Sequence, residues 1–208
     1  MDFAPGARFS YSNSNFILLG AVIEKVSGMP WADFLAKKIF VPAGMKSTGY
    51  EENPRFANAK GYVREGENLR EADPSDMSVR FSAGGLYSTA ADMMSLPRSL
   101  AAGKILKSST VEEMWTDRGN GYGYGWFVEN DNNRRSVAHN GKIDGFASSF
   151  RLFRDEDLFI AILSNVQSTN AERMSTALAA IAHGEPFRMP GEHKFVHVPP
   201  KVLDLYVG

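Results

Sequence analysis

Apolar residues recur at helical spacing through the first forty positions of the chain. Between Ser14 and Val26 they lie three or four residues apart, and Gly28 follows as a typical helix stop. Pro30 then suits the first turn of a second helix, in which four apolar residues share one face: Trp31, Phe34, Leu35 and Ile39. The spacing therefore predicts two helices in succession.

The next forty residues lack this regularity. Residues 41–79 are rich in Gly, Pro, Asn and charged side chains, which predicts long loops with one short strand around residues 61–63. Helical signals return where Thr89 and Asp92 form a capping-box pattern. Pro97 is expected to stop or kink the helix that follows.

After Gly119 the spacing becomes typical of strands. Four such segments follow one another, separated by turn residues: "YGYGWFVEN", "RSVAHNG", "ASSFRLFRD" and "LFIAILSN". The last one is continuously apolar, as in a strand covered on both faces. Thr169 with Glu172 then forms a capping pattern for a final helix, which we expect to pack on an antiparallel sheet. This order of elements predicts the α+β class.

Composition narrows the function without revealing it. The chain has 208 residues, of which 43% are hydrophobic and 23% charged, and its net charge is −1. Such a balance gives no electrostatic reason to bind nucleic acid, and no apolar run reaches the roughly 20 residues that span a bilayer. The opening "MDFAP" shows no signal-peptide pattern, and the chain has no cysteine. The compartment is therefore left undetermined.

Two short motifs carry the candidate chemistry. Tyr11 and Asn13 directly precede the first helix, where a phenol could move a proton and an amide could bind a substrate. The alternative is an exposed Tyr beside an Asn that caps the helix. His139 and Gly141 end a predicted strand, and Gly145 follows before Phe146, so that the backbone could approach a ligand closely. The alternative for His139 is a structural role.

Other motifs are set aside. His193 and His197 have an i, i+4 spacing, but the Glu of a zinc protease does not follow His193, and no third ligand is evident. The glycines at 121, 123 and 125 do not have nucleotide-loop spacing, and no G-x-S-x-G elbow occurs. We therefore expect no metal and no cofactor.

Five collinear segments resemble the serine β-lactamase and penicillin-binding-protein-like superfamily. They are "PGARFSYSNSNFILLGAVIEKVSG", "PAGMKSTGY", "SAGGLYSTAADM", "HNGKIDGFASSF" and "LFIAILSN". The resemblance is to the class C β-lactamase-related branch, which also contains esterases and D-amino-acid peptidases. It implies a partial β-lactamase/transpeptidase-like fold, an antiparallel sheet flanked by helices.

The resemblance also assigns roles to residues. Tyr11 corresponds to the proton-transfer Tyr and Asn13 to the Asn that contacts the substrate amide. His139 and Gly141 correspond to a His-x-Gly version of the Lys-Thr-Gly motif, and Lys142 would supply an oxyanion-hole N–H. The glycine pair 84–85 would lie in a loop that lines the cleft.

One part of the family pattern does not occur in these residues. The family's nucleophile is the Ser of a Ser-x-x-Lys motif, several tens of residues before the Tyr-x-Asn motif, and the 208 residues contain no such motif. We therefore expect residues 1–190 to be a partial domain without the N-terminal strands and nucleophile helix, with one sheet edge open. Residues 191–208 would be a linker and the start of a truncated C-terminal β-rich domain.

The expected function follows from this comparison. The chain would be a fragment of a serine hydrolase that acts on an ester, a D-amino-acid amide or a β-lactam, inactive without the missing N-terminal segment. His139 in place of Lys favours an esterase or peptidase, because an unperturbed imidazole is mostly uncharged at neutral pH. The alternative is a non-catalytic binding module that retains the cleft. An in-frame Ser-x-x-Lys in the genomic sequence upstream of Met1 would favour the enzyme.

Overall fold

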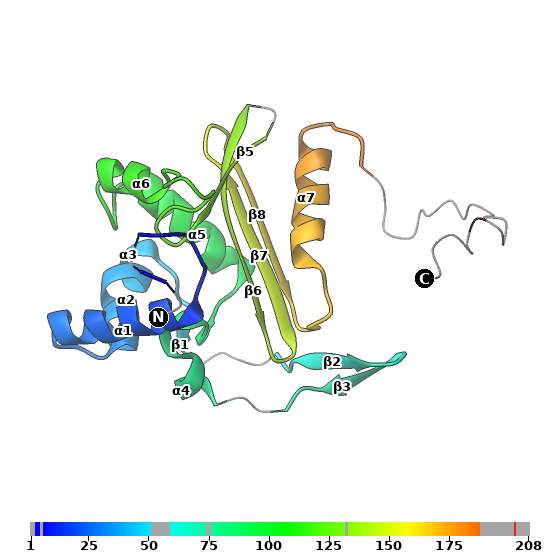
Figure 1. Cartoon of the computed structure of the whole chain (residues 1–208), viewed down its shortest axis with the longest axis horizontal. Helices are drawn as coiled ribbons and strands as arrows, with labels where there is room; N and C mark the ends of the chain where they lie inside the picture. Colours follow the sequence, from blue (N-terminus) through cyan, green and yellow to red (C-terminus); the bar gives the residue numbers. More distant parts are fainter. Residues whose placement is uncertain are drawn as a thin grey trace. The chain divides into compact units, whose positions relative to one another are not determined.

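Four antiparallel strands form the sheet that the sequence predicts after Gly119. They are β5 (Phe127–Asp131), β6 (Arg134–Ile143), β7 (Phe146–Phe153) and β8 (Leu158–Ser164), in the order β5-β6-β7-β8 (Figure 1). The structure is a computed structural model, and it describes residues 3–4, 6–50, 59–73, 76–131, 133–187 and 202. The sheet and the α+β class are confirmed.

The turn between β6 and β7 follows from two residues. Ile143 pairs with Phe146, so that Asp144 and Gly145 alone form the loop. Gly145 has a φ of +81°, which lies in the left-handed region that two-residue hairpins require and that glycine adopts without steric cost. The local sequence thus fixes the register of the two longest strands.

Strand β6 has two dissimilar halves. Residues 134–138 pair with β5 on one side and with β7 on the other side from Ser136 onward. Residues 139–143 pair with β7, and within the described residues no strand lies on their other side. Ser136, Val137 and Ala138 are buried, whereas the second half is exposed or half-buried. The core and the candidate site therefore share one strand.

The two N-terminal helices form as predicted. Helix α1 spans Asn13–Ser27, and the second helical stretch runs through α2 (Trp31–Leu35), the π-helical segment η1 (Ala36–Phe40) and α3 (Val41–Ala43). The N-cap of α1 is Ser12, which makes no side-chain capping bond. Asn13 is thus the first helical residue, and its interpretation as a helix cap is wrong.

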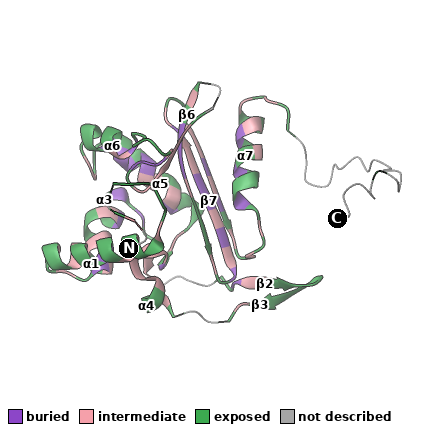
Figure 2. Cartoon of the chain, viewed as in Figure 1, coloured by how far each residue is buried: buried purple, intermediate pink, exposed green. Residues whose placement is uncertain are grey.

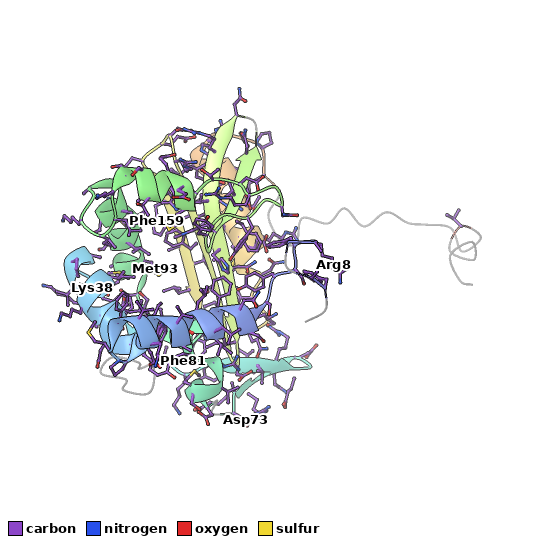
Figure 3. All side chains as sticks on the ribbon, turned by 60° about the vertical axis from the view of Figure 1, so that its left-hand side comes forward. Arg8, Lys38, Asp73, Phe81, Met93 and Phe159 are labelled. Atoms are coloured by element: carbon purple, nitrogen blue, oxygen red, sulfur yellow. The ribbon has the colours of Figure 1, made fainter. Side chains whose placement is uncertain are left out.

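Helix α1 carries an exposed apolar stripe, and much of its surface is solvent-accessible (Figure 2). The stripe consists of four residues with exposed fractions of 63%, 54%, 55% and 82%: Leu18, Leu19, Val22 and Val26. The opposite face packs on the short 3₁₀ turn η2 (Phe81–Ala83). There Ser82 donates a hydrogen bond to the carbonyl of Phe16, and Phe81 lies beside α1 (Figure 3).

The later helices differ from prediction in detail. Helix α5 spans Ala90–Ala101, and its N-cap Thr89 accepts a hydrogen bond from the Asp92 N–H. It continues through Pro97, so a stop at that residue is wrong, while a kink there remains a prediction. Helices α6 (Ser108–Met114) and α7 (Ala171–Ala182) follow. The cap of α7 is Asn170 rather than Thr169, because the Asn170 side chain accepts from the Arg173 N–H.

The segment expected to be loop contains more structure than predicted. β1 (Gly49–Tyr50) pairs with β4 (Leu86–Tyr87), and β2 (Tyr62–Glu65) pairs with β3 (Asn68–Glu71). A short helix, α4 (Met77–Arg80), follows. The β2–β3 loop is Gly66-Glu67, with φ +62° at Gly66. That two-residue Gly-x turn is a hairpin signal that the composition of the segment concealed.

A hydrophobic cluster joins the sheet to the helices. Its buried members come from α5, from α6 and its C-cap, and from β6: Leu100, Val111, Trp115 and Val137. A second cluster gathers around Phe40, Ala43 and Met45.

Within the described residues, no helix has the length and apolar character that crossing a bilayer requires.

The chain divides into two units, Met1–Ser175 and Thr176–Gly208. The proposed domain boundary at 190 remains a prediction, because residues 188–201 and 203–208 lie outside the described part of the chain. In the first unit, the Asn140 amide of β6 donates to Glu172 in the first turn of α7 at 3.1 Å. Packing of the remainder of α7 on the sheet also remains a prediction.

Candidate active site

Three polar aromatic side chains from distant segments meet beside β6. Tyr11 precedes α1, Tyr122 precedes β5, and His139 begins the open half of β6. The ring centroids of Tyr11 and His139 are 5.9 Å apart, those of Tyr11 and Tyr122 also 5.9 Å, and those of Tyr122 and His139 6.1 Å. The structure thus brings together the two motifs identified in the sequence, with Phe127 also against the His139 ring at 5.2 Å.

Both ring nitrogens of His139 are engaged. Nδ1 lies 2.7 Å from the backbone carbonyl oxygen of Asn140, and Nε2 lies 3.1 Å from the hydroxyl of Tyr122. A carbonyl oxygen can only accept, so in the neutral ring Nδ1 carries the proton. The Nε2 lone pair then accepts from the Tyr122 hydroxyl.

The environment of the two tyrosines favours the protonated phenol. Tyr122 is 8% exposed, and burial raises its pKa to about 12, with the neighbouring Tyr11 adding to the effect. Tyr11 is 42% exposed, and the burial of the remainder of its side chain raises its pKa in the same direction. At neutral pH both hydroxyls can therefore donate a hydrogen bond.

The open half of β6 presents backbone groups to solvent. Gly141 and Lys142 are exposed, and among the described strands each pairs with β7 alone, opposite Ser148 and Ala147. In an antiparallel strand, the N–H groups of alternate residues point toward the same edge. The free edge beside His139 can therefore donate hydrogen bonds to an oxygen of a bound molecule.

Asn13 follows this cluster at the start of α1. It is exposed, and among the described residues nothing forms a hydrogen bond with its side-chain amide. That amide is available to both donate and accept. Of the two motif residues, Tyr11 packs in the aromatic cluster, and Asn13 is exposed in the first turn of α1.

Gly145 does not have the role suggested for it. A Cβ there would lie 2.5 Å from the Gly61 Cα and 2.8 Å from the Tyr62 nitrogen, so the close neighbour is the chain itself rather than a ligand. The Tyr62 N–H donates to the Gly145 carbonyl at 3.1 Å. Gly145 therefore anchors the turn at the end of β6.

The glycine pair 84–85 lies near the same end of the strand. A Cβ on Gly84 would be 3.8 Å from an Ile143 methyl group, whereas one on Gly85 would overlap the Tyr50 ring at 2.4 Å. Its contribution to a cleft remains a prediction.

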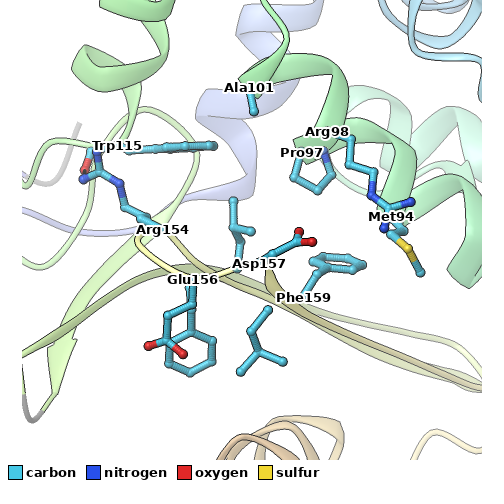
Figure 4. A pocket seen from close by; sticks show the side chains of 12 residues that line it. Met94, Pro97, Arg98, Ala101, Trp115, Arg154, Glu156, Asp157 and Phe159 are labelled. Carbon is cyan, nitrogen blue, oxygen red and sulfur yellow. Dashed lines mark hydrogen bonds between the residues drawn. The ribbon is translucent and has the colours of Figure 1, made fainter. Parts of the chain in front are cut away.

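A separate cavity of about 280 Å³ lies between α5 and the β7–β8 hairpin (Figure 4). Its walls include Trp115, Pro97 and Phe159, together with the charged ends of Arg98 and Asp157. None of its lining residues belongs to the Tyr11, Tyr122 and His139 cluster.

The described residues contain no group of three or more His, Cys, Asp or Glu side chains suited to a metal, and His193 and His197 lie outside the described part.

Sequence reasoning missed Tyr122. The sequence pattern predicts a strand at this position, whereas β5 begins at Phe127. The alternating glycines around it indicate a tight loop, although they flank Tyr124 in the same way. Gly121 has φ +67°, and a Cβ on Gly123 would lie 2.3 Å from the Met114 carbonyl oxygen, so these glycines shape a tight loop rather than a strand. Such a loop directs Tyr122 inward toward His139.

Two bacterial proteins illustrate the sequence similarity of this chain to known proteins. The chain is 30% identical over 169 residues to the penicillin-binding protein PbpX of Bacillus subtilis, an assignment that its name marks as provisional; the match covers 79% of this chain and 41% of that protein. It is 27% identical over 197 residues to the D-aminopeptidase of Brucella canis, covering 89% of this chain and 38% of the relative. The chain therefore spans about two fifths of the length of each of these relatives.

Solved structures agree with this similarity. The D-stereospecific amidohydrolase of a Streptomyces species superposes with a TM-score of 0.76 at 25% identity, over 89% of this chain and 58% of that one. The penicillin-binding-protein and β-lactamase-like fold expected from the motifs is thereby confirmed. A family model described as Beta-lactamase matches residues 1–185. The chain accordingly belongs to the β-lactamase family, a family of serine hydrolases.

Proposed function

We propose that this chain forms one wall of the active site of a serine hydrolase that cleaves a D-amino-acid amide or a carboxylic ester through an acyl-serine intermediate. The observation that carries the proposal is the packing of Tyr11 against His139, with ring centroids 5.9 Å apart, beside the open edge of β6. A proton donor lies beside a strand edge that can supply backbone N–H groups, and an amide follows two residues after Tyr11. These are the groups that acyl transfer requires besides a nucleophile.

Each residue would have a distinct task. Tyr11, whose pKa is raised by burial, would donate a proton to the leaving group rather than act as the base. Asn13 would bind the amide or ester of the substrate. A backbone N–H from the stretch containing Gly141 and Lys142 would donate to the oxyanion of the tetrahedral intermediate.

The choice of substrate class rests on His139. A Lys at this position would attract a substrate carboxylate, whereas a neutral imidazole provides no such charge. That difference favours an amide or an ester over a β-lactam. The names of two relatives, a D-aminopeptidase and a D-stereospecific amidohydrolase, support the same choice.

The nucleophile would come from a segment that carries Ser-x-x-Lys, a motif that the 208 residues do not contain. Two surfaces support this arrangement. One is the apolar stripe on α1, and the other is the outer edge of β8, along which no described strand pairs. The 208-residue chain by itself would then hydrolyse substrates no faster than background.

The test compares the chain alone with a longer version in which the upstream Ser-x-x-Lys segment is restored. Both are assayed with a chromogenic cephalosporin, a p-nitrophenyl ester and a D-amino-acid p-nitroanilide, and both are treated with a fluorophosphonate label. Turnover only in the longer protein, with the adduct on the serine of the restored motif, is the expected result. Labelling of a serine within the 208 residues would refute it.

The rival function is a non-catalytic binding module that retains the cleft. This candidate needs the contact of Tyr11 with His139 and the exposed amide of Asn13, but no nucleophile. It predicts that the D-amino-acid amide binds the 208-residue chain, and that no upstream segment confers turnover. Calorimetric titration of the chain with that amide, next to the kinetic assay, separates the two functions.

A further inference from the structure

We propose that Tyr122 is a positioning residue that holds His139 in the Nδ1-protonated form, with Nε2 occupied by the phenol instead of a substrate. This inference concerns a residue to which neither the motifs nor the relatives assign a role. Its consequence for substrate choice rests on the proposed function, but the geometry of the pair does not.

The first support is the direction of the two hydrogen bonds. The Asn140 carbonyl oxygen lies 2.7 Å from Nδ1 and has no proton to give, so Nδ1 is the donor of the neutral ring. The Tyr122 hydroxyl lies 3.1 Å from Nε2, which is then an acceptor. One contact selects the tautomer, and the other uses the lone pair that this tautomer exposes.

The second support is the burial of Tyr122. At 8% exposure, its hydroxyl has little access to water, and a buried phenol without a partner would be costly. Its elevated pKa also keeps the proton on the phenol over the range in which the neutral imidazole can accept it. Tyr122 therefore keeps a proton that it can donate to Nε2 of His139.

The third support is the packing of the Tyr122 ring. Phe9, Tyr11 and Phe127 surround it, with centroid distances of 5.6, 5.9 and 5.0 Å. These contacts fix the phenol in place, so the hydrogen bond to Nε2 costs little additional conformational entropy. Because Phe127 also contacts His139, the imidazole and the phenol share one rigid aromatic cluster.

The chemical result is a His139 whose two ring nitrogens are both hydrogen-bonded within the protein. With both nitrogens engaged, it has no free N–H for a substrate carboxylate and no free lone pair to act as a base. A substrate group that lies against it would be uncharged, such as an amide, an ester or an apolar side chain. Tyr122 thereby sets which substrate groups this wall of the site accepts.

The test begins with the wild-type chain. Long-range ¹H–¹⁵N correlation spectra, recorded at a pH of about 8.5 where an ordinary imidazole is neutral, should show His139 with a pyrrole-type Nδ1 and a pyridine-type Nε2. A pyrrole-type Nε2 would overturn the proposal. This measurement needs neither activity nor a variant, so its failure is distinct from failure of the proposed function.

A second measurement probes the Nε2 lone pair through its reaction with diethylpyrocarbonate, with peptide mapping to follow His139. Tyr122→Phe should raise the rate at His139 by about fivefold, which corresponds to the net energy of a typical hydrogen bond. Tyr124→Phe is the matched control, because Tyr124 lies in the same loop and is 56% exposed. The rate at His183 should be equal in all three proteins. An unchanged rate at His139 in Tyr122→Phe would contradict the proposal.

Discussion

The two halves of β6 have opposite surroundings, although they belong to one continuous strand. Residues 134–138 have β5 along one edge, are joined by β7 from Ser136, and bury Val137 completely, at 0% exposure. Residues 139–143 lose the β5 neighbour, and their side chains become exposed or half-buried. Because β6 extends beyond the end of β5, one half of it lies in the core and the other half has a free edge. The buried half, residues 134–138, therefore positions His139 and the residues after it without forming part of the candidate site.

The largest difference between the two halves is expected when a negatively charged side chain is introduced into each of them. Val137→Asp should lower the free energy of unfolding by at least about 4 kcal/mol, because an unpaired carboxylate would enter the cluster around Leu100 and Trp115. Lys142→Asp, in the exposed half, should change it by about 0.5 kcal/mol or less. Urea titrations followed by circular dichroism measure both. Equal losses would show that the two halves are not distinct.

The turn that closes the open half provides the next test. Gly145→Ala should lower the free energy of unfolding by about 2–4 kcal/mol, since it adds a Cβ at φ +81° and forces it against the backbone of Gly61. Gly66→Ala is the control, because Gly66 has φ +62° but no atom within 4 Å of its Cβ position. Its expected loss is about 1 kcal/mol. A Gly145→Ala loss no larger than the control would remove the argument for close approach.

Tyr122, which contacts His139 at the boundary of the two halves, should give a pH-dependent effect. The pKa of Tyr122 is raised from 10.0 to about 12, so its contribution to stability is fully present below pH 10. As the pH rises from about 10 to 12, the unfolded chain releases this proton first, and the native state loses stability. Tyr122→Phe should be less stable than wild type at pH 8, and the difference should shrink above pH 10. A constant difference across this range would contradict the pKa shift.

The smallest effect is expected in the exposed half itself. Asn140→Ala removes the 3.1 Å hydrogen bond to Glu172 and should cost about 0.5 kcal/mol or less, because both groups are solvated. Hydrogen exchange in the first turn of α7 should nevertheless become faster, because that bond ties the turn to β6. Unchanged exchange would show that other contacts hold the turn.

The sequence predicted most of the sheet and the first helices for a clear physical reason. Alternating and continuous apolar runs predict β6 and β7 with a turn at residues 142–145 between them. The structure shortens that turn to Asp144-Gly145, because Lys142 and Ile143 still pair with β7. Predictions of helix boundaries failed where two neighbouring residues could serve as the cap, or where tertiary packing opposed the local preference of a residue. Thr169 and Asn170 are both good caps, and only the second is used. Pro97 stays within α5 because tertiary packing, which buries it, outweighs its local preference.

The candidate site was predictable only in part. The motifs identified Tyr11 and His139, but their 5.9 Å contact depends on the fold and on no local pattern. Tyr122 could not be chosen in advance over Tyr124, because a glycine-rich loop determines which of the two rings turns inward. Tyr124 instead remains outside, where Arg118 lies 4.8 Å from its ring centroid.

The apolar stripe on α1 has a practical consequence for handling the isolated protein. Four large aliphatic side chains on one helix face attract hydrophobic dyes and other surfaces while the native fold is intact. Association of native molecules through this stripe, rather than thermal unfolding, should then limit the protein concentration that stays in solution. Samples would precipitate in proportion to concentration and to kosmotropic salt, with an unchanged circular dichroism spectrum in the remaining solution.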